Sequence, residues 1–286
     1  MRVSLACIPC IMKQAYNTAI RATDDEEAIR RILNLTAEYI TTLDLSQSPA
    51  DASNFVYHIT SKIAENPDPY LEDKKKYNDL CLSMLPDLRK RIDESEDPLY
   101  TAVKISVLGN FIDLGIGHAF DLARDLERIL DIPFAIDDYS DFVRLLASGR
   151  KNILYLGDNA GEIVFDRLLI EQLIPHHDIT FVVKKSPIIN DATREDAEYV
   201  GMTDIVPVID TGSNDIGVGW SKVSEEFVRR YKSADLIIAK GHGNYETMEG
   251  KRGIIFFILK AKCAYVAKTL GVSLGDCVFR MSRIGE

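Results

Sequence analysis

The spacing of apolar residues divides the chain into two parts with different predicted secondary structure. Up to about residue 146, apolar residues recur every three or four positions between charged ones, which is typical of amphipathic helices. Asp, Ser and Pro residues mark the starts and breaks of these segments. The predicted helices cover residues 10–22, 25–43, 49–65, 70–92, 98–116, 119–130 and 138–147.

From about residue 150 the pattern changes to short β-branched runs separated by helical stretches. The predicted strands cover residues 153–156, 179–183, 205–209, 236–239, 254–260 and 277–281, with helices over 163–173, 193–200, 221–231 and 263–270. Strands that alternate with helices form βαβ units and a mainly parallel sheet. The sequence therefore predicts an α/β protein with an N-terminal all-helical domain, residues 1–148, and an α/β domain, residues 149–286.

Composition narrows the classes of partner. The chain has 286 residues, of which 46% are hydrophobic, so a sizeable core is expected. A net charge of −10 without a basic patch disfavours binding to nucleic acid or to an anionic membrane. The chain lacks an apolar run long enough to span a bilayer, and its five cysteines are an odd number. We expect a cytoplasmic protein, and its oligomeric state stays open.

Polar residues follow the first two predicted strands of the second part. Asp158, Asn159 and Glu162 lie in the run Gly-Asp-Asn-Ala-Gly-Glu directly after the first strand, and Asn190 and Asp191 follow the second. The carboxyl ends of parallel strands meet at one edge of a sheet, where ligands bind. Asp158, Asn159 and Asp191 could supply three oxygen ligands to magnesium or manganese. The alternative is that these residues are ordinary turn and helix-cap residues.

A third polar segment, Lys-Gly-His-Gly-Asn-Tyr-Glu, begins at Lys240 after the fourth predicted strand. Lys240 offers a compact positive charge for a phosphate, and Gly241 allows backbone amides to approach an anion. Asn244 and Glu246 complete the candidate substrate-binding residues of this loop, and His242 lies inside it. The segment predicts a phosphate-binding loop beside the metal site.

Two polar residues, Asn110 and Asp113, interrupt an otherwise apolar helical pattern. They are three positions apart and therefore share a helix face. A buried polar group without a partner costs about 1–3 kcal/mol, so both need partners. A substrate at the interface between the domains would provide them, and so would a structural hydrogen bond to a neighbouring loop.

The N-terminal pair Cys7 and Cys10 has the spacing of half a zinc site or of a redox pair. Neither Cys81, Cys263 nor Cys277 forms a second close pair with another cysteine. Two partly buried thiols at the start of a helix are an equally good interpretation.

Taken in order, these segments resemble the metal-dependent damage-control phosphatases, a family first catalogued as a domain of unknown function. The paired N-terminal cysteines resemble the smaller, microbial-type branch of that family. The segments that carry the resemblance are Cys7-Ile8-Pro9-Cys10 with Gln14, Asp68-Pro69-Tyr70 with Lys74 and Asn78, Gly109-Asn110 with Asp113, the run from Gly157 to Glu162 with Phe165-Asp166, Asn190-Asp191-Ala192-Thr193, and Lys240-Gly241 with Gly243-Asn244-Tyr245-Glu246.

The resemblance implies a helical region followed by a Rossmann-like α/β/α domain. It also implies that Asp158, Asn159 and Asp191 bind a divalent metal (manganese, magnesium, cobalt or nickel) and that Lys240 contacts a substrate phosphate. Family members hydrolyse small phosphate esters such as sugar phosphates. Some eukaryotic relatives have been described as protein-glutamate (carboxyl) methyltransferases, but this chain has no glycine-rich adenosylmethionine loop. His242 stands where some relatives have Gln, which leaves the role of the lysine unchanged.

These observations lead to one main hypothesis and two rivals. The main hypothesis is a metal-dependent phosphomonoesterase in which Asp158, Lys240 and Glu162 are catalytic. Asp158 would either attack the phosphorus or only bind the metal. One rival is a non-catalytic protein that binds nucleotides or phosphometabolites, and the other is a thiol–disulfide protein that uses Cys7 and Cys10.

Overall fold

The computed structural model describes residues 1–107, 109 and 130–285. Its helices are α1 (Cys7–Ala22), α2 (Glu26–Thr41), α3 (Pro49–Ile63), α4 (Leu71–Asp93), α5 (Pro98–Ser106), α7 (Tyr139–Ala147), α8 (Glu162–Leu173), α9 (Arg194–Tyr199), α10 (Glu225–Ser233), α11 (Gly241–Met248) and α12 (Ala264–Leu270). Its strands are β1 (Ile136–Asp137), β2 (Asn152–Leu156), β3 (Asp178–Val183), β4 (Val208–Asp210), β5 (Leu236–Lys240), β6 (Gly253–Lys260) and β7 (Cys277–Ile284).

Local capping explains where several helices begin. The Asp25 side chain accepts a hydrogen bond from the Glu27 amide at the start of α2, and Ser48 does the same for Asp51 at the start of α3. Such caps satisfy backbone donors that have no partner inside the helix. None of the helices in the described ranges is long and apolar enough to cross a membrane.

The seven strands form one sheet in the order β1-β7-β6-β5-β2-β3-β4. Strands β2 to β6 run parallel, whereas β7 pairs antiparallel with β6 and parallel with β1. The chain passes from β2 outward to β3 and β4, and then returns to place β5 on the other side of β2. Ligands of α/β proteins bind at such a reversal, outside the carboxyl ends of the strands. Here that point lies between the ends of β2 and β5.

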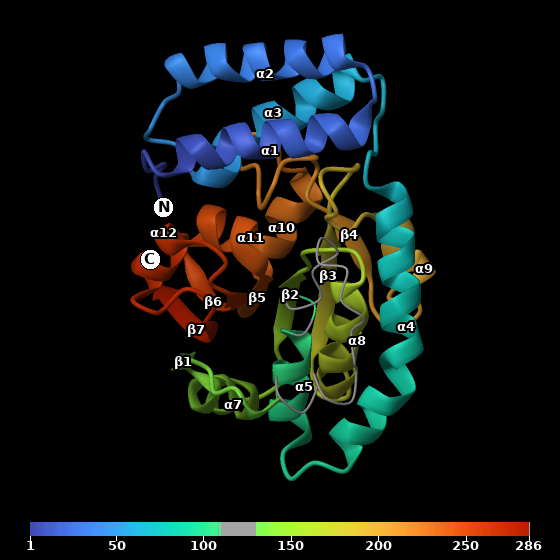
Figure 1. Ribbon diagram of the computed structural model, residues 1–286. Helices are drawn as coiled ribbons and strands as arrows, with labels where there is room; N and C mark the ends of the chain where they lie inside the picture. Colours follow the sequence, from blue (N-terminus) through green and yellow to red (C-terminus); the bar gives the residue numbers. More distant parts are fainter. Residues whose placement is uncertain (108, 110–129, 286) are drawn as a thin grey trace.

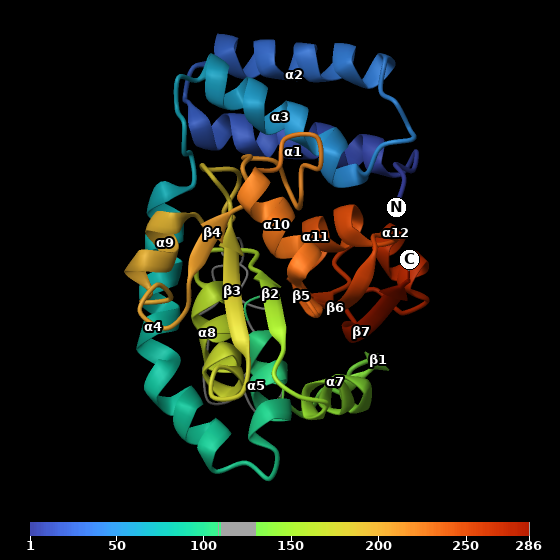
Figure 2. The same ribbon diagram turned by 180° about the vertical axis from the view of Figure 1, so that it is seen from behind.

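Helices cover both faces of the sheet and so produce three layers (Figures 1 and 2). On one face, Tyr155 of β2 shares a core with Leu88 of α4 and Phe165 of α8. On the other face, Leu154 shares a core with Phe227 of α10, and α11 and α12 complete that layer. Successive residues of β2 after Asn152 are all buried but face the two cores in turn, as expected of a strand with both faces covered. The predicted combination of helices with a mainly parallel sheet is confirmed.

The helices α1, α2 and α3 form a separate layer above one end of the sheet (Figure 1). They have a small core of their own, which includes Ile11, Ala15 and Val56. We call α1 to α3 the helical layer.

The main core does not divide at residue 148, where the sequence predicted a domain boundary. Leu88 of α4, Val103 of α5 and Phe142 of α7 lie in the same core as Tyr155 and Phe165. Strand β1, from the first half of the chain, also joins the sheet. The correction has a simple physical reason: α4, α5 and α7 bury their apolar faces against the sheet layers, and only the helical layer packs on itself.

Two further features differ from the predictions, and a third concerns β7, whose direction the sequence did not predict. Residues 241–248, predicted as a loop, form α11, which begins at the residue directly after the end of β5. Strand β4 begins only after Pro207, because proline cannot donate to a strand ladder. Strand β7 runs opposite to its neighbour β6. Asn110, Asp113 and the helix predicted over residues 119–130, except for its last residue, lie outside the described residues.

Candidate functional site

The structure brings together the two acidic segments that follow β2 and β3. The Asp158 carbonyl oxygen accepts the Ala192 amide at 2.9 Å, and the Ala160 amide donates to the Asn190 carbonyl at 2.8 Å. Asn159 and Asp191 are directly paired as an isolated antiparallel bridge. These main-chain contacts hold the predicted ligands Asp158, Asn159 and Asp191 at one edge of the sheet.

Three carboxylates from these segments, those of Asp158, Glu162 and Asp191, lie close enough to interact electrostatically. Glu162 and Asp191 are 2% and 4% exposed, whereas Asp158 keeps part of its surface open. Burial raises the pKa of Asp158 well above its usual range, and the charges of Glu162 and Asp191 raise it further. Burial also raises the pKa of Asp191, although the Lys184 ammonium, 3.5 Å from its carboxylate, opposes that shift. Without a further cation, the fully charged state of Asp158 and Asp191 is therefore disfavoured.

This donor set fits a hard divalent cation in chemical type. Two carboxylates and the Asn159 amide are oxygen ligands of the kind that magnesium and manganese prefer. The repulsion between Asp158, Glu162 and Asp191 is what a bound cation would relieve. Over the described ranges, no three His, Cys, Asp or Glu side chains form a metal site by themselves. A metal here would therefore depend on Asn159 or on water for its remaining ligands.

Lys240, predicted to contact a phosphate, is fully buried at the end of β5. Its ammonium donates to Glu162 Oε1 at 2.7 Å, to Asp166 Oδ1 at 2.6 Å and to the Ser106 carbonyl at 2.6 Å. Burial disfavours the charged form, but the charges of Asp166 and Glu162 outweigh it and raise the pKa of Lys240. All three donor positions of this ammonium are thus used inside the protein.

Asp166 is a member of the site to which the sequence assigned no role. Its Oδ1 also accepts a hydrogen bond from the Tyr155 hydroxyl at 2.7 Å, and its Oδ2 is buried without a hydrogen-bond partner among the described residues. Burial raises the pKa of Asp166 to about 6. The spacing of Glu162 and Asp166 was the available signal, because residues four apart share one face of a helix.

Glu162 joins this buried network to the metal-ligand candidates. Its Oε1 accepts from Lys240, and its Oε2 lies 3.3 Å from the Asn159 amide nitrogen, which also donates to Asp158 at 3.0 Å. A continuous chain of polar contacts therefore leads from Asp166 through Lys240, Glu162 and Asn159 to Asp158.

Gly241 and Asn244, predicted to bind substrate, instead shape the protein around Asp158. A Cβ atom on Gly241 would lie 1.9 Å from Asp158 Oδ2, and its φ of +77° is one that favours glycine. The Asn244 amide nitrogen donates to the Gly157 carbonyl at 3.1 Å and to the Lys240 carbonyl at 2.8 Å. It thereby ties the end of β2 to the end of β5.

Glu246 lies apart from this network, at the contact between α11 and the helical layer. Its carboxylate accepts the Ala50 amide of α3, and burial raises its pKa to about 7. His242 stands nearer to the site: its Nε2 lies 2.8 Å from the Lys260 carbonyl oxygen and 2.9 Å from the Lys262 amide nitrogen. It attaches the segment after β6 to the start of α11.

Helix α4 supports the Asp158 segment from the other side. The Asn78 amide oxygen accepts the Gly161 amide at 2.7 Å, and its nitrogen donates to Asp196 at 3.0 Å. Lys74 binds Asp68 at 2.8 Å and Asp196 at 3.3 Å. The sequence singled out Lys74 and Asn78 only as part of the family resemblance, and the structure shows their positions in a buried network.

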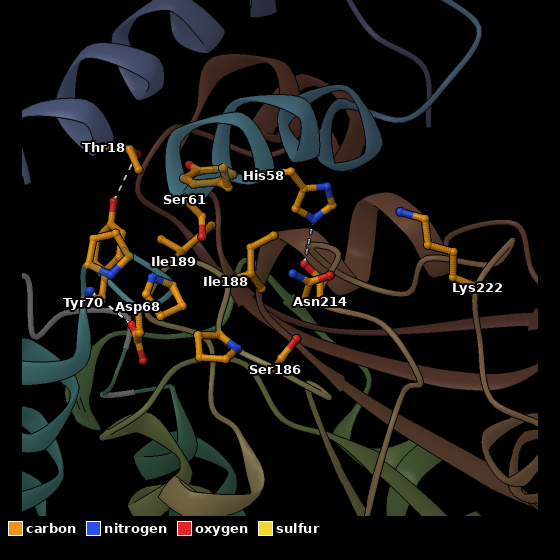
Figure 3. A pocket seen from close by; sticks show the side chains of 14 residues that line it. Thr18, His58, Ser61, Asp68, Tyr70, Ser186, Ile188, Ile189, Asn214 and Lys222 are labelled. Carbon is orange, nitrogen blue, oxygen red and sulfur yellow. Dashed lines mark hydrogen bonds between the residues drawn. The ribbon is translucent and has the colours of Figure 1, made fainter. Parts of the chain in front are cut away.

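A cavity of about 460 Å³ lies between the helical layer and the segments that follow β3 and β4. Figure 3 shows hydroxyl groups of Thr18, Ser61, Tyr70 and Ser186 around it. Its wall also contains Ile189, which adopts a left-handed φ of +48° that is rare for a β-branched residue. Residues with such strained backbone conformations occur most often at functional sites.

The cavity lies next to the acidic cluster. Ile188 and Ile189 of its wall come directly before Asn190 and Asp191, and the Asp191 amide donates to the Ile188 carbonyl at 3.1 Å. Tyr57, on the opposite wall, lies close enough for the Asp191 charge to raise its pKa further, after burial. The Asp191 segment therefore continues directly from the cavity wall, although the carboxylates of the cluster are not among the residues that line the cavity.

The N-terminal cysteines are free thiols. Burial raises the pKa values of both Cys7 and Cys10, and the neighbouring Cys263 adds to the effect on each. Reactive redox cysteines need a lowered thiol pKa, because the thiolate is the attacking species. The electrostatic setting of this pair therefore favours resting thiols over a redox centre.

Known proteins share this sequence along nearly its whole length. Residues 3–278 match the damage-control phosphatase ARMT1-like domain. The chain is 35% identical to the damage-control phosphatase PH1575 of Pyrococcus horikoshii over 283 residues, which cover 97% of each protein. It is 34% identical to a damage-control phosphatase of Archaeoglobus fulgidus over 290 residues, which cover 98% of this chain and 99% of the relative.

A solved structure shows the same fold. It is the crystal structure of a DUF89 family protein from Pyrococcus horikoshii, which superimposes with a TM-score of 0.90 at 35% identity and covers 98% of each chain. Sequence and structure therefore agree over nearly the whole length, and the chain belongs to the damage-control phosphatase family.

Proposed function

We propose that this protein is a metal-dependent phosphatase that hydrolyses small phosphate monoesters, such as sugar phosphates or related damaged phosphometabolites. The observation that carries the proposal is the convergence of Asp158, Glu162 and Asp191 at the sheet reversal, next to a cavity. Two relatives that align along nearly their whole length are named damage-control phosphatases, which supports the same reaction class.

Asp158, Asn159 and Asp191 would hold the metal, with manganese, magnesium, cobalt or nickel as the candidates. When bound, a divalent cation supplies positive charge that polarises phosphoryl oxygens and orients the reacting groups. Glu162 would position Asn159 and Asp158, because its carboxylate lies between Lys240 and the Asn159 amide. Lys240 would act through Glu162 and would not bind substrate directly, since its ammonium is enclosed.

The cavity supports a small and polar substrate. Its walls carry several hydroxyl groups, the Asn214 amide and two tyrosine rings, with His58 and Lys222 as cationic or titratable groups. Hydroxyl and amide groups recognise a polyhydroxylated molecule by hydrogen bonds, and rings pack on its apolar face. We propose that the protein acts on such substrates in the cytoplasm. Its five cysteines are free thiols, which is typical of proteins in a reducing compartment.

The test is a phosphatase assay on the purified protein with a panel of sugar phosphates and nucleotides. We expect phosphate release that is abolished by EDTA and restored by added manganese. Replacing the candidate ligands, D158N or D191N, should lower the rate at least about 100-fold, the scale on which misplaced catalytic groups act. D178N is the matched control, because Asp178 is an exposed aspartate at the opposite end of β3.

Two outcomes would contradict the proposal. The first is a rate that stays unchanged in a D158N/D191N double variant. The second is tight binding of a phosphometabolite without any release of phosphate across the panel, which would favour a binding protein. Reduction of insulin that depends on both Cys7 and Cys10 would instead support a thiol–disulfide protein.

A further inference from the structure

One end of the cavity presents a lysine, and the acid that pairs with it lies outside the wall. His58 and Lys222 line the cavity, whereas their partner Asp215 does not. The Lys222 ammonium lies 3.0 Å from Asp215 Oδ1, and His58 Nε2 lies 3.4 Å from the same oxygen. A ligand at this end of the cavity would therefore meet the lysine and the histidine, with the carboxylate behind them.

Asp215 is held in place by its surroundings. It is 3% exposed, and a Cβ atom on Gly219 would lie 2.4 Å from its Oδ2, so the carboxylate fits only because residue 219 has no side chain. The next amide, that of Ile216, donates to Asn54 Oδ1 of α3 at 2.8 Å and fastens the segment to the helical layer. Asp215 can therefore hold the Lys222 ammonium at one end of the cavity.

The Lys222 ammonium keeps the capacity for a second acidic partner. An ammonium has three donor positions, and in the described part of the chain Asp215 is the one acceptor found for Lys222. Its side chain is 55% exposed, whereas Lys74 and Lys240 are almost fully buried and contact two carboxylates each. Lys222 thus has one carboxylate where the two buried lysines have two.

The other end of the cavity has a different chemistry. Figure 3 shows Thr18, Tyr70 and Asp68 gathered there, on the side away from Lys222. The Thr18 and Tyr70 hydroxyl groups lie 3.2 Å apart, and the Asp68 carboxylate pairs with Lys74 at 2.8 Å. The cavity therefore fits a molecule with uncharged hydroxyl groups at one end and a negative charge at the other.

The loop that carries Asp215 also contacts the acidic cluster. The Lys184 ammonium lies 3.5 Å from the Asp191 carboxylate and donates to the carbonyl oxygen of Gly217, two residues after Asp215. The lysine end of the cavity and the metal-ligand candidates are therefore fixed relative to one another by a single loop.

We propose that the Lys222 ammonium binds a carboxylate group of the substrate. The inference rests on the proposed function and narrows it: the substrates would be small phosphate esters that also carry a carboxylate, such as phosphorylated sugar acids. A carboxylate has one negative charge, which matches a single ammonium, whereas a second phosphate would bring nearly two. Lys222 would then bind two carboxylates, as Lys74 and Lys240 do within the protein.

The experiment compares two substrates that differ in one group. Sorbitol 6-phosphate and 6-phosphogluconate have the same open carbon chain, but the second has a carboxylate where the first has a terminal hydroxymethyl group. We expect the manganese-loaded protein to have a KM about tenfold lower for 6-phosphogluconate, the scale of one charge-assisted hydrogen bond. K222M should abolish this preference, and K222R should retain most of it because the charge is kept.

The matched control is K232M, which replaces an exposed lysine in the last turn of α10, outside the cavity wall. It should keep the preference. K222M is expected to fold, because the lysine is more than half exposed, and a melting temperature close to that of the unmodified protein would verify this. A preference that survives in K222M, or that is absent from the unmodified protein, would overturn the inference.

The two proposals fail in different ways. If the protein hydrolyses both esters equally well, the Lys222 assignment is wrong and the phosphatase function stands. If it hydrolyses neither, the phosphatase function is wrong, and calorimetry with gluconate and sorbitol, which carry no phosphate, decides the assignment. Tighter binding of gluconate that K222M abolishes would support a carboxylate contact at Lys222, and equal binding of the two would overturn it.

Discussion

Gly241 occupies a position where one additional carbon atom would displace a functional group. The nearest atoms to its hypothetical Cβ are those of the Asp158 carboxylate, the closest of them at 1.9 Å. Real Cβ atoms do not approach a carboxylate so closely, so the acid would have to move. The absence of a side chain at residue 241 is thus part of how Asp158 is positioned.

We therefore expect G241A to lower kcat about 100-fold although no charged group is removed, because displacements near 1 Å have effects of that size. The measurement is phosphate release under saturating substrate. The control is G250A, since Gly250 has a similar φ of +81° but no atom within 4 Å of a Cβ. G250A also places an alanine at a positive φ, with a similar cost in stability, and should keep its activity. Equal rates for the two variants would show that the steric contact is unimportant.

At the scale of elements, the Lys240 network joins β5 to α8 inside the core. The lysine holds two carboxylates of one helix face, and Asp166 additionally binds Tyr155 of β2. Buried charges of this kind need their partners, because removing one leaves the other without compensation. The network therefore orients α8, and with it Glu162, relative to the end of β2.

Replacing this lysine should be costly for folding. We expect K240M to lower the free energy of unfolding by about 3–5 kcal/mol, as for a broken buried ion pair. The control K222M breaks the Lys222–Asp215 pair, in which the lysine is 55% exposed, and should cost less than about 1 kcal/mol. Urea unfolding of both variants provides the comparison. A K240M loss no larger than that of K222M would contradict this role.

Most elements could be predicted because their signals are local. Periodicity and caps marked α2, α3 and β2 to within a few residues. Helix α11 was missed because Gly241 and Gly243 have low helix propensity, and the helix is stabilised by burial of Tyr245 and Met248 in the core. The position of Asp158 and Asp191 at one edge of the sheet could also be predicted, since the carboxyl ends of neighbouring parallel strands lie at the same edge.

The partners of Lys240 could not be predicted by the same means. They lie 78 and 74 positions away in the sequence, and the pairing depends on how α8 packs against β5. From the sequence alone, a lysine that follows a strand is therefore predicted to be a free cation. Its carboxylate partners become known only from the packing of the helices against the sheet. The predicted boundary at residue 148 differs from the structure for a related reason, because an amphipathic pattern does not say which neighbour covers its apolar face.

At the scale of the whole molecule, Glu246 contributes to the attachment of the helical layer to the rest. Burial raises the pKa of its carboxyl group to about 7 from an ordinary value of 4.5. Between these values the folded protein keeps a proton that the unfolded chain has released. Stability should therefore fall as the pH rises from 4.5 through 7, and the cost stays in full above 7.

Replacing Glu246 should remove this pH dependence. We expect the difference in unfolding free energy between pH 5 and pH 8 to contain on the order of 2 kcal/mol from Glu246, which E246Q abolishes. The measurement is urea unfolding at both pH values. E38Q, which changes an exposed glutamate of α2, is the control and should keep the original difference. An unchanged difference in E246Q would contradict the assignment.

The cavity takes its walls from the helical layer, through Thr18 and Tyr57, and from the sheet, through Ser186 and Ile189. A metabolite can occupy it only while both cores are folded, so its binding energy counts toward the stability of the entire chain. At a concentration 100 times its dissociation constant, this amounts to about 2.7 kcal/mol. Scarcity of such a ligand would then expose the chain to proteolysis more often, and the abundance of the protein would follow the abundance of the metabolite that fills the cavity.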